Sequence, residues 1–342
     1  MPEPVKKHFC ILIFLLLLVS VLDILFGSSR LTWQELKEGL FLNQSDSAVN
    51  FVIWKYRIPK LITAMLAGAG LAVSGLLMQT LFRNPLAGPY VLGISSGAAF
   101  GVSFVMLGTS FLPQYVANFL RHDVGISMAA LSGTFFVMLL MIWVAGRVGG
   151  NFTILIMGLI IGQILGALQG LTNFLANPET LKEFVLWGLG SFTQTNNFQN
   201  LIMLFAVFLS LFVAIVYSGK LNTYLLGDLY AKSLGIDLRS FRRVVIIITC
   251  IAAGIITAFC GPIAFVGLAV PHLARHLFKT YKHSMLLPAS ALLGAILTVV
   301  CDLISHVFIE GYIIPINVIS AIFGGPVVVW VIVKQRAKMY EG

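Results

Sequence analysis

The sequence predicts an all-α, polytopic membrane protein with about ten transmembrane helices and both termini in the cytoplasm. Of its residues, 58% are hydrophobic and only 10% are charged, whereas soluble domains carry roughly 25% charged residues. Apolar runs of roughly 20 residues, long enough to cross a hydrocarbon core, recur along the chain. Most lysines and arginines fall in alternate connections, as the positive-inside rule predicts for cytoplasmic loops.

The apolar runs define the predicted spans in order. The first, after Lys6 and Lys7, could be a secretory signal, but no small-x-small cleavage site follows, so we expect an uncleaved helix. The eighth is the least regular, because Pro271, His272 and Arg275 interrupt it. The runs are 9–27, 58–81, 88–108, 125–146, 152–175, 198–218, 243–260, 263–278, 286–307 and 315–333.

The connections indicate one transmembrane domain over 1–342, since no linker divides the chain. In this topology 28–57, 109–124 and 176–197 lie outside, and 176–197 has the pattern of a short interfacial helix. The inner segment 224–243 has the length and charge of two short surface helices broken at Gly235. A turn alone would reverse the chain, so we expect a partner to contact this segment. The net charge of +9 follows from topology and does not require nucleic acid.

A glycine stripe marks the fifth run. Gly158, Gly162, Gly166 and Gly170 recur every fourth residue and therefore share one helix face. Such a face permits close helix packing, and it is also suited to line a passage.

Few residues suggest chemistry, so we expect no catalytic and no metal site. His272 and His276 are spaced like metal ligands on a helix, but Leu273 stands where the HExxH motif has its glutamate. Asp302 and His306 share one face of a helix and suggest a local ion pair. The sequence has no GxxxxGK[ST] phosphate loop, so an ATP-driven function needs ATP and Mg²⁺ bound by a separate subunit.

Several long motifs resemble the FecCD-type permeases, the membrane subunits of bacterial ABC importers for iron–siderophore complexes, haem and vitamin B12. These are "RIPKLITAMLAGAGLAVSGLLMQTLFRNPLAGPYVLGISSGAAFG" (57–101), "LGDLYAKSLGI" (226–236), "GPIAFVGLAVPHLARHL" (261–277) and "IPINVISAIFGGPVVVWVI" (314–332). The resemblance implies a homodimer in the bacterial cytoplasmic membrane, two cytoplasmic ATPase subunits, and a periplasmic or lipid-anchored substrate-binding protein. No cofactor is expected on the chain itself.

The resemblance also implies roles for particular residues. Asn84, Pro85 and Leu86 match a cytoplasmic gate, where prolines prevent a continuous helix. Arg57 and Lys60 match a basic motif that docks the binding protein, and His306 replaces a third docking arginine. The positions that match ATPase-coupling helices are Gly227, Asp228, Ala231, Lys232, Leu234 and Gly235.

The implied function is import of a ferric siderophore or haem, with vitamin B12 as the alternative substrate. From other classes, an ion-coupled secondary transporter and an intramembrane enzyme stay open. A proton-coupled transporter usually needs ionisable groups deep in the bilayer, and none is evident. Copurification of an ATPase separates the importer from both rivals.

Overall fold

The structure is a computed structural model that describes residues 3–26, 32, 48–109, 112–148, 150–307 and 313–340. Its regular elements are helices, and they follow the predicted apolar runs. In chain order they are α1 (Glu3–Leu25), α3 (Ala48–Val52), η1 (Ile53–Arg57), α4 (Ile58–Phe82), η2 (Pro89–Leu92), α5 (Ile94–Gly108), α6 (Gln114–Arg121), α7 (Asp123–Arg147), α8 (Asn151–Leu175), α9 (Pro178–Gly188), α10 (Asn197–Val216), α11 (Ser218–Leu225), α12 (Asp228–Ser233), α13 (Leu238–Cys260), α14 (Val266–Phe278), α15 (His283–Val307) and α16 (Ile316–Tyr340).

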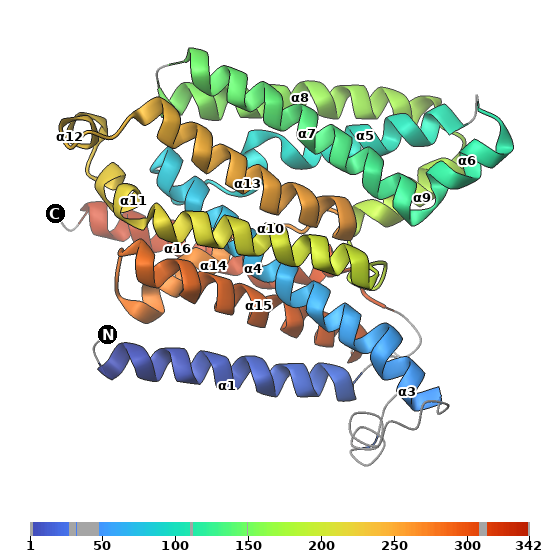
Figure 1. Cartoon of the computed structure of the whole chain (residues 1–342), viewed down its shortest axis with the longest axis horizontal. Coiled ribbons are helices and arrows are strands. Elements are labelled where there is room, and N and C mark those ends of the chain that lie inside the picture. Colours follow the sequence, from blue (N-terminus) through green and yellow to red (C-terminus); the bar gives the residue numbers. More distant parts are fainter. Residues whose placement is uncertain are drawn as a thin grey trace.

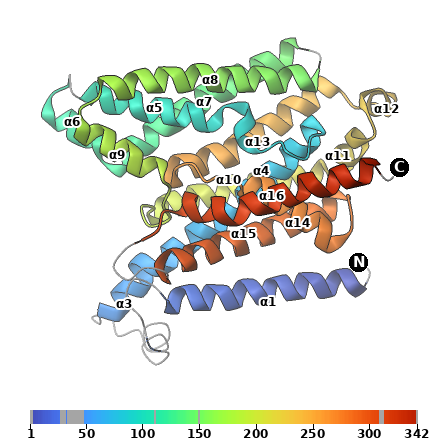
Figure 2. The same cartoon turned by 180° about the vertical axis from the view of Figure 1, so that it is seen from behind.

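The helices run side by side along the long axis of the molecule (Figure 1). The start of α1, the end of α16 and the short helices α11 and α12 lie at one end, here named the α12 end. The opposite end carries α3, α6 and α9 and is named the α9 end; Figure 2 shows the same arrangement from behind. Both described termini therefore lie on one side of the bundle, as an even number of spans requires.

Within the described part of the chain, seven helices are long and apolar enough to cross a membrane by length and composition. They are α1, α4, α7, α8, α10, α13 and α15, and α5 and α16 contain shorter apolar helices. Each predicted run overlaps a helix, although the third includes the short helix η2 and the eighth begins in irregular backbone, so helices at these positions are confirmed. Ten crossings and cytoplasmic termini stay predictions.

The eighth run is the poorest match to a full span. Only Val266–Phe278 is helical, 13 residues, and this length covers about 20 Å. The chain before it is irregular, with positive φ angles at Gly261 and Phe265. Helix α14 packs against α4, α15 and α16, so the irregular backbone lies against protein.

Helix α4 is the centre of the bundle, in contact with α10, α13, α14 and α15. Such close packing needs small residues at the crossings. A Cβ added at Gly75 would overlap the Gly267 carbonyl of α14, and one at Gly68 would overlap the Gly294 carbonyl of α15. The "GAGLAVSG" stretch of α4 is therefore a packing surface rather than a flexible segment.

The helix predicted within 176–197 is confirmed as α9, and its position at the membrane interface stays a prediction. Asn177 caps it by accepting a hydrogen bond from the Thr180 amide at 2.8 Å. The two short helices expected in 224–243 are only partly correct. Helix α12 ends before Gly235 as expected, but the segment after it is the start of the long helix α13. The apolar side of "LRSFRR" continues into that span, which explains the longer helix.

Candidate functional site

The predicted gate is a loop between α4 and η2 at the α12 end. Helix α4 ends at Phe82, and Arg83 takes a left-handed conformation with φ of 46°. The Asn84 amide then donates to the Gln79 carbonyl at 3.1 Å, which closes the helix end. The Asn84 side chain accepts from the Leu86 amide at 2.9 Å, and Leu86 is 40% exposed. The prolines do interrupt the helix here, as expected.

This loop is fixed to α14. The His272 ring donates a hydrogen bond from Nε2 to the Pro85 carbonyl at 2.8 Å. One turn earlier, the Gln79 side-chain amide donates to the Leu268 carbonyl at 3.1 Å. His272 therefore supports the loop, and its spacing to His276 has a structural explanation, because the His276 ring packs edge-on against Trp330.

Arg83 joins the predicted gate loop to the predicted coupling segment. Its Nη2 lies 2.5 Å from Asp228 Oδ1, and its Nε and Nη2 donate to the Tyr224 carbonyl at 3.0 and 2.7 Å. The guanidinium also lies over the Tyr224 ring, 4.5 Å from its centre. Arg242 completes the group, since its Nη2 lies 2.7 Å from Asp228 Oδ2. One carboxylate therefore holds two arginines from different helix ends, an arrangement that sequence motifs alone did not reveal.

Tyr224 anchors this group to the bundle. Its hydroxyl lies 2.6 Å from Asn151 Oδ1 at the start of α8 and 3.3 Å from the Leu81 carbonyl. Burial raises the pKa of the Tyr224 phenol, so the hydroxyl stays protonated and can donate. The coupling segment, the gate loop and α8 are thus connected through one side chain.

The predicted coupling residues divide into two groups. Ala231 is fully buried against its own chain, and Asp228 is partly exposed, with its carboxylate paired to two arginines. Lys232, Leu234 and Gly235 are exposed. The structure adds apolar side chains that sequence reasoning missed, namely Leu226 at 67% exposed and Leu229 at 84% exposed. The sequence signal that could have identified these two side chains is the presence of leucines in a connection between predicted spans.

Backbone geometry at this segment requires glycine at two places. Gly227 has φ of 119° and Gly235 has φ of 79°, and neither would meet another atom if a Cβ were added. The constraint is therefore conformational rather than steric.

The predicted docking residues gather at the α9 end, but inside the protein. Lys60 Nζ lies 2.6 Å from Asp302 Oδ2 and 3.6 Å from Asp23 Oδ1. His306 Nε2 lies 3.8 Å from Asp302 Oδ1, which confirms the local pair expected on α15. The side chain of Lys60 is only 7% exposed. Lys60 therefore joins α4 to α1 and α15, and sequence reasoning missed Asp23 as its partner.

Arg57 is also buried, and its Nη1 donates to the carbonyls of Ile24 and Leu25. It thereby satisfies carbonyl groups at the end of α1. Arg57, Lys60 and His306 thus all have partners within the chain, and their role in docking stays a prediction. They still line a cavity of about 600 Å³ at the α9 end, together with the exposed Lys55.

The glycine stripe of α8 is divided between two environments. A Cβ added at Gly158 would crowd the Val91 carbonyl at 2.5 Å, and Gly162 lies against Gly93. Gly166 and Gly170 have no atom within 4 Å of an added Cβ. Packing therefore explains the first half of the stripe, while the second half faces away from the described chain.

Comparisons with known proteins agree with these features. A family model for the FecCD transport family matches residues 15–334. The hemin transport system permease protein of Yersinia pestis is 32% identical over 324 residues, 94% of this chain and 95% of that protein. The vitamin B12 import system permease protein of Escherichia coli is 32% identical over 285 residues, 83% of this chain and 84% of that protein.

A solved structure is also similar. A metal-chelate type ABC transporter in an inward-facing conformation superposes with a TM-score of 0.82 and 28% sequence identity. The match covers 96% of this chain and 99% of that one. The chain is therefore a transport subunit rather than an enzyme, and it belongs to the FecCD transport family.

Proposed function

We propose that this chain is the permease subunit of an ATP-binding-cassette importer that carries an iron chelate, haem or a ferric siderophore, across the bacterial cytoplasmic membrane. The contact of Arg83 with Asp228 carries the mechanism, because it joins an exposed surface to the predicted gate. The match to a hemin permease over 94% of the chain supports the substrate class. Cobalamin is the second candidate, since a vitamin B12 permease is equally identical.

The proposed assembly is a homodimer with two ATPase subunits and one substrate-binding protein. ATP and Mg²⁺ bind to the ATPase. The ATPase contacts the permease at the coupling surface, which consists of Leu226, Leu229, Lys232, Leu234 and Gly235. Four of these are exposed side chains and the fifth is a turn glycine, as a partner surface at this end requires. The α12 end then lies in the cytoplasm, with both termini, and the chain crosses the membrane about ten times.

The second permease copy faces the open half of α8. Gly166 and Gly170 leave room for a close approach or for a passage beside them. Helix α16 also presents apolar side chains away from the core, among them Ile322 and Val329. These two helices form the interface and the wall of the translocation path in this proposal.

Transport then proceeds by alternating access. Closure of the two ATPases moves α12, and Asp228 draws Arg83 and the start of the gate loop with it. Asn84, Pro85 and Leu86 change position at the exit of the path, while His272 holds the Pro85 carbonyl from the other side. A rigid-body shift of short elements at one end is sufficient for this change.

A transport assay tests the substrate and the energy source together. The chain and its ATPase are reconstituted in liposomes, and binding proteins loaded with haem, a ferric siderophore or cobalamin are added in turn. We expect ATP-dependent uptake of an iron chelate. Uptake of cobalamin alone would select the second candidate, and uptake driven by an ion gradient without ATP would refute the importer.

Cross-linking tests the gate. Leu86 is exposed beside the proposed exit, so a Leu86→Cys variant should cross-link to its counterpart in the dimer. The yield should differ between the ATP-bound and nucleotide-free complexes. Equal yields in both states would show that the loop does not move during the cycle.

A further inference from the structure

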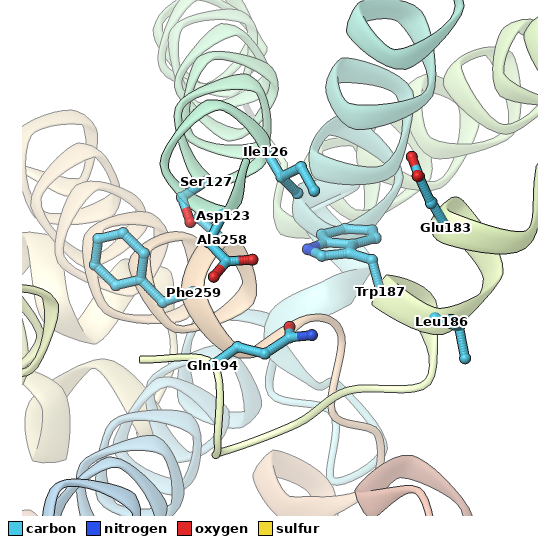
Figure 3. Close-up of a pocket in the computed structure, with 9 residues that line it drawn as sticks. All are labelled: Asp123, Ile126, Ser127, Glu183, Leu186, Trp187, Gln194, Ala258 and Phe259. Carbon is cyan, nitrogen blue, oxygen red and sulfur yellow. The ribbon is translucent and has the colours of Figure 1, made fainter. Parts of the chain in front are cut away.

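A second pocket at the α9 end adjoins the cavity lined by the basic residues described above. It has a volume of about 220 Å³ and is formed where the start of α7, helix α9 and the end of α13 meet (Figure 3). Its polar lining is acidic or neutral, and among the described residues no lysine or arginine lines it. The lining side chains used below are Asp123, Glu183, Trp187 and Gln194.

Trp187 supplies an unused donor. The residue is only 8% exposed, and its indole N–H has no hydrogen-bond partner among the described residues. Figure 3 shows the indole nitrogen turned toward the space beside the Asp123 carboxylate. Buried N–H groups in native proteins are nearly always paired, so the Trp187 N–H is available to an acceptor that enters the pocket.

The carboxylates of Asp123 and Glu183 supply negative charge at the pocket. Asp123 and Glu183 are exposed, and neither has an ion pair with a described lysine, arginine or histidine. In Figure 3 the two carboxylates lie on either side of the Trp187 ring. A ligand that spans them must be cationic and flat or extended, and the indole face favours a cation as well.

The pocket adjoins the basic cavity, since Asp123 and Gln194 line both. The mouth at the α9 end therefore carries both signs of charge. The exposed Lys55 lines the basic cavity, and Asp123 and Glu183 line the second pocket. A protein that docks across this end meets both signs of charge. Charge complementarity of this kind fixes the register of a complex.

We propose that this pocket receives an arginine of the substrate-binding protein, whose guanidinium meets Asp123 and Glu183 and whose peptide carbonyl accepts from the Trp187 N–H. The partner rests on the function proposed above, whereas the cation chemistry rests on the pocket alone. A bound metal ion fits less well, because two carboxylates separated by an indole ring do not supply the six or more oxygens that Ca²⁺ prefers.

The first experiment uses N-acetyl-arginine amide as the probe, with the chain in nanodiscs and tryptophan fluorescence as the readout. We expect a saturable change that is absent in Trp187→Phe and that requires at least tenfold more probe in Asp123→Asn. N-acetyl-citrulline amide, a neutral analogue of the same shape, should give no change. A response to citrulline amide equal to that for arginine amide, or the same change with calcium chloride alone, would overturn the proposal.

The second experiment measures docking of the loaded binding protein to the permease–ATPase complex. The double variant Asp123→Asn/Glu183→Gln should raise the Kd about tenfold, and arginine amide should compete. Glu179→Gln is the matched control, because Glu179 is exposed on the same helix but does not line the pocket. Unchanged docking by the double variant overturns the arginine contact. Failure of the unaltered chain to dock overturns the assembly instead, and the probe experiment still decides the cation chemistry.

Discussion

Arg83 and Asp228 lie 145 residues apart in sequence, yet Nη2 of the arginine is 2.5 Å from Oδ1 of the aspartate. The arginine stands directly before the gate loop, and the aspartate begins the short helix of the coupling surface. Arg83 also has a left-handed backbone, a conformation that non-glycine residues adopt only with support. Asp228 and the Tyr224 carbonyl provide that support, so we expect a displacement of α12 to act directly on the end of α4.

Loss of this contact should weaken coupling. Arg83→Gln and Asp228→Asn should each reduce substrate imported per ATP hydrolysed about three- to tenfold, because a charged, partly exposed contact contributes about 0.7–1.4 kcal/mol. The double variant should lose little more than either single variant. Lys220→Gln, an exposed change on α11, is the control. Strictly additive losses would show that the two residues act independently.

Lys60 should be required for stability more than for docking. Lys60→Met leaves Asp23 and Asp302 without their shared cation, and removal of one partner from a buried ion pair costs about 3–5 kcal/mol. We expect a lower Tm in detergent, with part of the loss restored when Asp302→Asn is added. No change in Tm would mean that the buried pairing is unimportant.

The same structure alters how docking should be tested. Replacement of Arg57 and Lys60 by glutamate would disturb the junction of α1, α4 and α15, so weaker docking would have two causes. Lys55 is exposed and lines the same cavity. Lys55→Glu should weaken docking with Tm unchanged, and normal docking by this variant would remove the basic side of the mouth from the interface.

Glycines of similar appearance in the sequence should respond differently to alanine. Gly75→Ala would push a methyl group into the Gly267 carbonyl, so α4 and α14 must separate and the Tm should fall by several degrees. Gly166→Ala meets no atom of the described chain and should leave the Tm of the isolated subunit unchanged. A fall for Gly166→Ala in the dimer alone would place the second copy at that face.

Much of the fold follows from the apolar runs, because a membrane requires long helices and the runs are long. The eighth run was predicted as a full span, but its first residues are not helical. Buried irregular backbone is as apolar in sequence as a helix, so residues 261–265 could not be distinguished from part of a span. Local spacing likewise predicted the pair of Asp302 with His306. It could not predict Asp23 with Lys60 or Arg83 with Asp228, because these contacts depend on how distant helices pack.

Gly235 tests the coupling surface most directly, because conformation and contact can be separated there. Its φ of 79° suits glycine and, at small cost, asparagine, while valine would be strained. Gly235→Asn therefore adds bulk without much strain, and Gly235→Val adds both. Gly219→Asn is the control, since Gly219 lies on α11 with equally open surroundings.

We expect both Gly235 variants to hydrolyse ATP with little import, because a side chain at this turn would hold the ATPase away from α12. The measurement is substrate imported per ATP hydrolysed, together with the amount of ATPase that copurifies. If only Gly235→Val is uncoupled, the left-handed turn is what matters and the ATPase does not touch residue 235. If both variants are fully coupled, the ATPase contact lies elsewhere on the α12 end, and the exposed Leu229 becomes the next position to change.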